Sequence, residues 1–178
     1  MKIDILSLFP EFIEAFFRQS MIKRALDAGL IEMAVTEPPH SRLHPVDDTI
    51  SGGGAGTLMQ CGPRFDACES VLPQKGPRDR VVFLSPAGIP FTQDKAKELY
   101  RDYDHLVLIC GHYEGVDHRV EEHLADELIS IGDYVLTGGE LGAMVFSDAV
   151  ARMVPGDLGD AGSAAGDSFY EPILEYPQ

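Results

Sequence analysis

Along the first 153 residues of the chain, short runs of consecutive apolar residues alternate with segments in which apolar residues recur every three or four positions. Short runs that are apolar throughout are typical of strands buried on both faces of a sheet. They predict strands over residues 2–9, 30–35, 80–85, 105–110 and 126–131. Apolar residues three and four apart predict helices over residues 10–29, 64–72, 92–101 and 116–124. A last helix is predicted from a capping box formed by Thr137 and Glu140.

Strands that alternate with helices predict an α/β domain with a mainly parallel sheet flanked by helices. Three of the strands, which end at Ser85, Cys110 and Ile131, run into turns that contain glycine. In open α/β sheets the carboxyl ends of the strands form the ligand crevice. Three such turns side by side therefore predict a pocket lined by backbone N–H and C=O groups rather than by charged side chains.

Two segments have no periodicity. Residues 36–60 hold several prolines and the glycines 52–54 and 56, and a loop of this length inside a compact domain is usually functional or mobile. These glycines fit neither the dinucleotide fingerprint nor the P-loop, so a dinucleotide or ATP site is disfavoured. Residues 159–166 are small and polar and predict a linker or lid.

The composition narrows the class of protein. A chain of 178 residues is long enough for one domain with its own core. Its three cysteines form no Cys-x-x-Cys pair and its histidines match no zinc spacing, which predicts a cytoplasmic protein with no disulfide framework and no metal site. Cys110 is expected to be a small buried hydrophobe rather than a nucleophile. No apolar run is long enough to cross a bilayer, so no membrane contact is predicted.

The net charge of −15 works against nucleic-acid binding, because phosphate contacts rely on Lys and Arg. The charge is unevenly distributed. Residues 1–101 carry 12 basic and 13 acidic side chains, whereas residues 102–178 carry 2 basic and 16 acidic ones. An RNA partner is therefore expected to approach the first half of the chain.

Two glycine-bracketed strings carry the strongest functional signal. They are Gly111-His112-Tyr113-Glu114-Gly115 and the run from Ile131 to Glu140. With further ordered matches from Ile3 to Gln178, they resemble the bacterial tRNA (guanine-N1)-methyltransferases, a family of the knotted SPOUT superfamily. The resemblance implies that residues 1–158 form a methyltransferase domain with a C-terminal deep trefoil knot, and that residues 159–178 are a flexible linker or lid. It also implies a tRNA substrate and a homodimer with active sites at the subunit interface.

The same resemblance implies that the pocket holds S-adenosylmethionine, the methyl donor. Its binding residues, carried over by motif, are Leu84, Ser85, Pro86, Gly111, Tyr113, Glu114, Gly115, Ile131, Gly132, Asp133, Tyr134, Val135, Leu136, Gly138 and Gly139.

Asp167 and Arg152 occupy the positions of the family's catalytic residues. Guanine N1 bears a proton and is a poor nucleophile, so methyl transfer to it calls for a base during the attack. The resemblance implies that Asp167 is this base, and that Arg152 orients the guanine and supports charge developing on O6. The expected product is methylated on N1 of the guanosine 3′ of the anticodon. The motifs leave open whether Mg²⁺ takes part.

The chain departs from the family pattern in three places. Relatives continue beyond Gln178 into a basic helical domain that grips tRNA, so that C-terminal tRNA-binding domain is expected to be absent. Residues 38–45 are a shorter loop than in relatives, and His112 stands where relatives usually carry arginine. Each departure removes positive charge from an RNA-facing region. We therefore expect cofactor binding with weak or no tRNA methylation.

Two alternatives stay open. One is another SPOUT RNA methyltransferase that acts on the ribose 2′-oxygen, which does not need Asp167 as a base for guanine. The other is a cofactor-binding dimerisation module with impaired catalysis, which the expected lack of the basic domain favours. Substitution of Asp167 distinguishes the ribose methyltransferase from the main interpretation. Restoring a C-terminal domain distinguishes the module with impaired catalysis from it.

Overall fold

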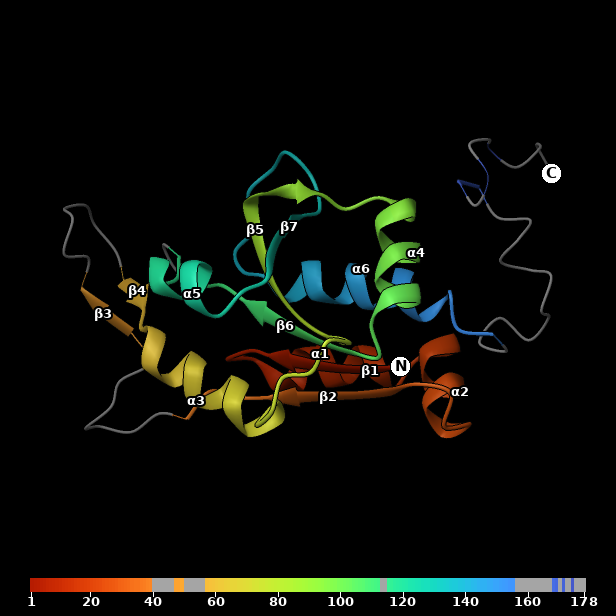
Figure 1. Ribbon diagram of the computed structural model, residues 1–178, viewed down its shortest axis with the longest axis horizontal. Coiled ribbons are helices and arrows are strands. Elements are labelled where there is room, and N and C mark those ends of the chain that lie inside the picture. Colours follow the sequence, from red (N-terminus) through yellow and green to blue (C-terminus); the bar gives the residue numbers. More distant parts are fainter. Residues whose placement is uncertain are drawn as a thin grey trace.

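The computed structural model describes residues 1–39, 47–49, 57–112, 115–155, 168–169, 171 and 174. Its centre is a five-stranded sheet with the order β2-β1-β6-β5-β7, and every neighbouring pair is parallel (Figure 1). The strands are β1 (Lys2–Leu6), β2 (Glu32–Thr36), β5 (Asp79–Pro90), β6 (His105–Cys110) and β7 (Glu127–Ser130). The predicted α/β class with a mainly parallel, helix-flanked sheet is confirmed.

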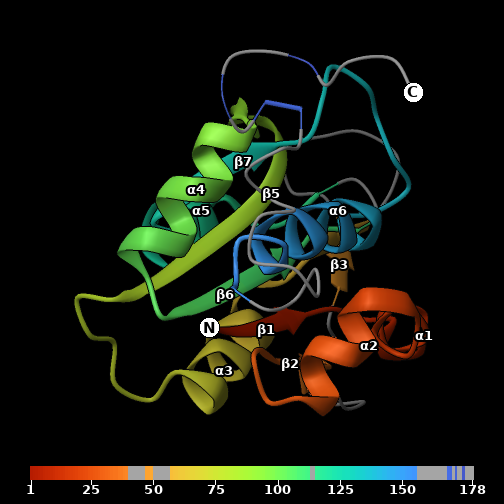
Figure 2. The same ribbon diagram turned by 90° about the vertical axis from the view of Figure 1, so that its right-hand side faces the viewer.

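The sheet is buried on both faces because successive side chains of its strands enter two different cores. In β6, Leu106 and Leu108 pack in one core and Val107 and Ile109 in the other. Figure 2 shows α3 on one side of the sheet and α1, α2 and α6 on the other. The first core takes residues from α1 (Pro10–Phe17), α2 (Ser20–Asp27), α4 (Gln93–Asp102) and α6 (Glu140–Ala151); the second takes them from α3 (Cys61–Val71) and α5 (His118–His123).

One predicted helix is two helices in the structure. The prediction of a continuous helix over residues 10–29 is wrong, because the chain leaves helical geometry between α1 and α2. Gln19 is extended, with φ −117° and ψ 149°, and Ser20 has a positive φ of 51°. The step from the buried Phe17 to the buried Ile22 is five residues, so a single helix would turn Ile22 away from the core. The break restores the buried face of the second helix.

Two other segments are more ordered than the sequence predicts. The strand expected to end at Ser85 continues through Pro86 to Pro90, and its register against β7 shifts between Leu84 and Ile89. Part of the segment expected to be irregular, residues 36–60, forms an antiparallel pair, β3 (Asp47–Thr49) and β4 (Thr57–Met59). The predicted end of the strand at Ser85 is therefore wrong, and so is the prediction that residues 36–60 are irregular throughout. Glycines 52–54 and 56 lie outside the described residues.

Gly88 allows the long strand β5 to cross β7 closely. A Cβ atom at this position would lie 2.4 Å from the backbone nitrogen of Ile129, a contact that neither strand can relieve by moving a side chain. Gly62, on α3, has open space around the same position.

We therefore expect Gly88→Ala to lower the free energy of unfolding by about 2 kcal/mol or more, because the added methyl group overpacks a backbone contact. The matched control, Gly62→Ala, should raise it by about 0.5 kcal/mol, because alanine restricts the unfolded chain. Urea unfolding followed by circular dichroism measures both. Equal stability of the two variants would contradict the close crossing of β5 and β7.

Candidate active site

A cavity of about 410 Å³ opens at the carboxyl ends of β5, β6 and β7, where the sequence predicts a pocket. Twelve of the predicted cofactor-binding residues line it: Leu84, Ser85, Pro86, Gly111, Gly115, Ile131, Gly132, Tyr134, Val135, Leu136, Gly138 and Gly139. Asp133 is exposed and does not line the cavity. Tyr113 and Glu114 lie outside the described residues. The structure thus brings together turns that are up to 55 positions apart in the sequence.

The turns are fastened to one another by backbone contacts that exclude side chains. The N–H of Gly139 donates to the carbonyl oxygen of Gly111 over 2.8 Å. A Cβ on Gly139 would lie 2.9 Å from the Cα of Cys110, and one on Gly138 would lie 2.3 Å from the Glu140 Oε2 atom. Glycine is required at position 139 because two backbone segments meet there without room for a methyl group, whereas the atoms closest to Gly138 belong to the side chains of Glu140 and His112.

The turn after β7 is held by its own side chains. The N–H of Gly132 donates to Ser130 Oγ over 3.2 Å, and the hydroxyl of Tyr134 donates to the Ile131 carbonyl over 3.1 Å. Gly132 has a φ of +153°. Val135, at the outer edge of this turn, is 88% exposed. Hydrogen bonds therefore hold the base of the turn, whereas its tip exposes apolar surface. Exposed apolar surface is typical of a site that a ligand or partner covers.

Met59 contacts the described residues that follow β6, His112 and Gly115 to Asp117. It is fully buried, and its sulfur accepts hydrogen bonds from the backbone N–H of His112 and from Arg64 Nη2 at 3.0 and 3.1 Å. Its own N–H donates to Gly115, and its carbonyl oxygen accepts from Asp117. Sequence reasoning missed Met59, because a lone methionine in a segment without periodicity carries no signal of such a role. Its strand β4 links the glycine-rich segment to the pocket.

Glu140 has a different role from the predicted one. The capping box with Thr137 does not form: Gly139 is the N-cap of α6, no side chain caps it, and Thr137 is exposed. The Glu140 carboxylate instead turns inward and accepts a 2.9 Å hydrogen bond from Ser7 Oγ at the end of β1. Its other oxygen lies 3.9 Å from His112 Nδ1. The prediction failed because a buried partner more than 100 residues away replaced the local one.

Of the two predicted catalytic residues, the one that the structure describes, Arg152, does not line the pocket of its own chain. Arg152 is the C-cap of α6, whereas Gly139 and Gly142 line the pocket at the other end of the same helix. Twelve helical residues at 1.5 Å each separate the two ends by about 18 Å. Asp167 lies outside the described residues. The roles of both residues stay predictions.

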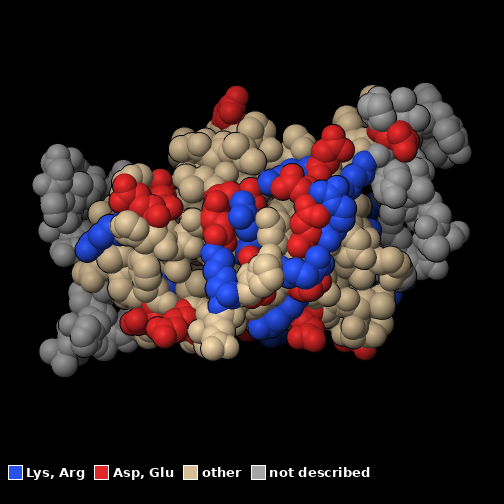
Figure 3. Space-filling view, viewed as in Figure 1, with Lys and Arg blue, Asp and Glu red and all other residues tan. Residues whose placement is uncertain are grey.

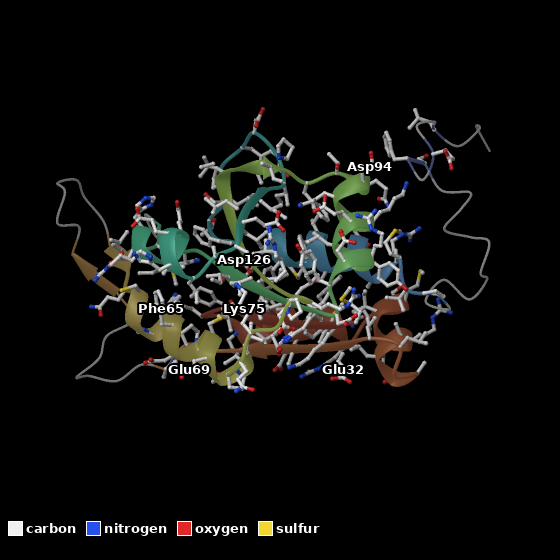
Figure 4. All side chains as sticks on the ribbon, in the orientation of Figure 1. Glu32, Phe65, Glu69, Lys75, Asp94 and Asp126 are labelled. Atoms are coloured by element: carbon white, nitrogen blue, oxygen red, sulfur yellow. The ribbon has the colours of Figure 1, made fainter. Side chains whose placement is uncertain are left out.

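Positive side chains in the first half of the chain are largely engaged by carboxylates. Glu127 binds both Arg80 and Lys95, at 3.1 and 2.7 Å, and Arg78 binds Asp104 at 2.6 Å. Lys75 pairs with Asp126, labelled in Figure 4. Figure 3 shows Lys and Arg interleaved with Asp and Glu on this face, without a broad basic patch. RNA phosphates would have to compete with these carboxylates here.

The described residues place no three His, Cys, Asp or Glu side chains where they could share a metal ion. No helix within the described parts of the chain combines the length and apolar character needed to cross a membrane.

The geometry defines an α/β protein with a cavity between glycine turns at the carboxyl ends of parallel strands. Comparison with known proteins gives the family. The family model for tRNA (Guanine-1)-methyltransferase TrmD matches residues 1–178. The chain therefore belongs to the tRNA (guanine-N1)-methyltransferase family.

Individual relatives agree with this assignment. The chain is 50% identical to the tRNA (guanine-N(1)-)-methyltransferase of Desulforamulus reducens, over 99% of this chain and 71% of that protein. It is 51% identical to the enzyme of the same name from Leuconostoc mesenteroides, over 100% of this chain and 73% of that protein. The crystal structure of tRNA (m1G37) methyltransferase from Aquifex aeolicus superposes with a TM-score of 0.81 at 32% identity, covering 90% of this chain and 72% of that one.

Cys110 lies directly behind the pocket wall and is buried, as predicted. Burial raises the pKa of its thiol well above the ordinary value, and burial likewise raises the pKa of Cys68 to about 11. Cys61 is only partly buried. Since the thiolate is the reactive form, neither buried cysteine is suited to nucleophilic catalysis.

We expect a maleimide at pH 8 to label Cys61 of the native protein and to leave Cys68 and Cys110 unmodified, as measured by peptide mass spectrometry. Unfolding in urea should expose all three to labelling. Rapid labelling of Cys110 in the native protein would contradict the closed packing of Gly139 against β6.

Proposed function

We propose that this protein transfers the methyl group of S-adenosylmethionine to N1 of the guanosine 3′ of the anticodon in tRNA. The observation that carries the proposal is the assembly of three sequence-distant glycine turns around one cavity, in a chain about half identical to enzymes of that name. The proposal assigns residues 1–158 to the methyltransferase domain and residues 159–178 to the lid. A tRNA substrate and three free cysteines favour the cytoplasm as its location.

The pocket suits an adenosyl cofactor in size and chemistry. Its volume falls in the range of about 300 to 1,000 Å³ typical of small-molecule sites. Leu84, Ile131 and Leu136 provide apolar surface for a flat base, and the glycine turns provide N–H and C=O groups for its polar edges. S-adenosylmethionine supplies a methyl group on a positively charged sulfur.

The proposal includes a trefoil knot, formed where the chain after β7 passes between the turns after β5 and β6. Two features favour this path. β7 pairs with β5 up to Pro90, and the chain then returns so that Gly139 bonds to Gly111 at the end of β6. A knotted turn would hold the pocket walls rigidly, which suits a site built from backbone groups.

Two side chains perform the acid–base and charge chemistry. The Asp167 carboxylate would take the proton from guanine N1 as this nitrogen bonds to the methyl carbon and the carbon–sulfur bond breaks, which would leave a neutral thioether. The Arg152 guanidinium donates hydrogen bonds to guanine O6, where negative charge develops as the proton leaves. A base on the lid becomes correctly placed only when the substrate orders that segment, which favours the right tRNA.

The site is proposed to use two chains. Arg152 is about 15 Å along α6 from Gly142 at the pocket of its own chain, so a second subunit is the natural source of the arginine. Phe12 of α1 and Leu141 and Val145 of α6 are each about half exposed, at 50%, 47% and 51%. Large apolar side chains gathered in this way are typical of a subunit interface. Contact between α1 and α6 of two copies would bring each Arg152 toward the partner's pocket.

Cofactor binding is tested by Gly139→Ala. This variant should raise the dissociation constant for S-adenosylmethionine by at least about tenfold, because the new methyl group displaces the pocket wall from β6. Gly62→Ala is the matched control. Gly62 does not line the pocket and an added Cβ there meets open space, so its affinity should change little. Titration calorimetry measures both. No affinity of the unmodified protein for the cofactor would overturn the proposed function.

Catalysis is tested by Asp167→Asn, which should lower methyl transfer to tRNA transcripts by a factor on the order of a hundred or more because the base is lost. Cofactor affinity should not change. The assay uses transcripts with and without guanosine at the target position. Retained turnover of Asp167→Asn would instead favour methylation of a ribose 2′-oxygen.

The shared site is tested by mixing two variants under conditions that exchange subunits: Gly139→Ala, assayed at a cofactor concentration too low for it to bind, and Arg152→Ala. If each site draws on both chains, the mixed dimer contains one intact site, and up to about a quarter of the unmodified activity should return. No recovery, with dimer exchange verified by mass spectrometry, would place the whole site in one chain.

A further inference from the structure

Glu140 is an ionisable group at the pocket that neither the proposed reaction nor the sequence pattern explains. Its side chain is buried, with 6% of the residue exposed, and it lies just behind Gly138 and Gly139, which line the cavity. The hydrogen bond from Ser7, itself 1% exposed, fixes its position. Burial of a carboxylate costs free energy unless a nearby positive charge and hydrogen bonds stabilise it.

The charge that it balances is that of the helix α6. The N-terminus of this helix lies at the cavity, which Gly138, Gly139 and Gly142 line, and a helix N-terminus carries a partial positive charge. Lined by glycines, such an end would attract phosphate and repel a cation. Glu140 is the first residue of α6 and brings a full negative charge to the same place.

The field of Glu140 reaches the pocket wall. Burial raises the pKa of the Cys110 thiol, the negative charge of Glu140 raises it further, and this effect exceeds the opposing one of Arg64. His112 faces the same carboxylate at 3.9 Å, and Glu121 lines the cavity from α5.

We propose that Glu140 is the residue that makes this pocket selective for a positively charged sulfonium ligand over its neutral thioether product and over anionic nucleotides. The inference rests on the proposed function, since it concerns the same cofactor. It gives product release a physical basis: methyl transfer removes the positive charge that the carboxylate stabilises.

The experiment compares S-adenosylmethionine with S-adenosylhomocysteine, which has the same shape without the charge on sulfur. Glu140→Gln keeps the size of the side chain and can still accept the hydrogen bond from Ser7. It should lower the preference for the sulfonium ligand by about tenfold, the scale of a unit charge acting through a protein dielectric. The affinity for the thioether should change less than about twofold. Titration calorimetry at pH 8 gives the ratio of the two dissociation constants.

Two control variants separate charge from structure. Glu140→Asp keeps the charge, and Ser7→Ala keeps it while removing the hydrogen bond, so both should retain the ratio of the unmodified protein. If Glu140→Gln weakened the binding of both ligands equally, the inference would be overturned. It would also be overturned if Ser7→Ala changed the ratio as much as Glu140→Gln does.

If Glu140→Gln does not fold, the inference is tested by ligand binding to the unmodified protein. The amine-bearing analogue sinefungin, also a cation, should then bind more tightly than the thioether, and the reverse order would overturn the inference. Failure of the proposed function has a different outcome, in which the unmodified protein binds none of these adenosyl ligands.

Discussion

The backbone hydrogen bond from Gly139 to Gly111 is the contact on which the site depends. It joins the start of α6 to the end of β6, residues that are 28 positions apart, with no side chain between them. Because a methyl group at Gly139 would collide with Cys110, the two segments can approach only as bare backbone. The cavity is the space that this approach leaves between the turns, so its shape is set by chain geometry rather than by large side chains.

The surrounding core makes this geometry rigid. β6 is buried on both faces, and α6 contributes Ala143, Phe146 and Val150 to the same core as Leu108. Phe146 also stacks on Phe91, which follows β5, at a centroid distance of 4.9 Å. The three elements that carry the pocket turns are thus packed against one another. A rigid scaffold of this kind lets short turns hold a ligand without the entropy loss of ordering long side chains.

The sequence predicted the elements better than their ends. All five strands and the class of sheet were predictable, because strands buried on both faces leave continuous apolar runs such as residues 105–110. The break at Gln19 and the continuation of β5 past Pro86 were not, since both depend on packing that local pattern does not encode. The pocket glycines were predictable as strand-end turns, and the family resemblance extended that prediction to neighbouring residues. Ser7, Met59 and the inward turn of Glu140 required the fold, because each acts through a partner at least 50 positions away.

The acidity of the chain has two different consequences in the structure. On the surface, carboxylates such as Asp104 hold basic side chains in ion pairs, and solvent screens exposed pairs such as that of Arg78 with Asp104. At the pocket the Glu140 carboxylate is buried beside a helix N-terminus, where screening is weak, and Glu121 brings a second carboxylate to the cavity wall. The net charge of −15 therefore says little about the ligand. What matters is that one acidic residue, Glu140, is held by Ser7 at the point where α6 meets the cavity.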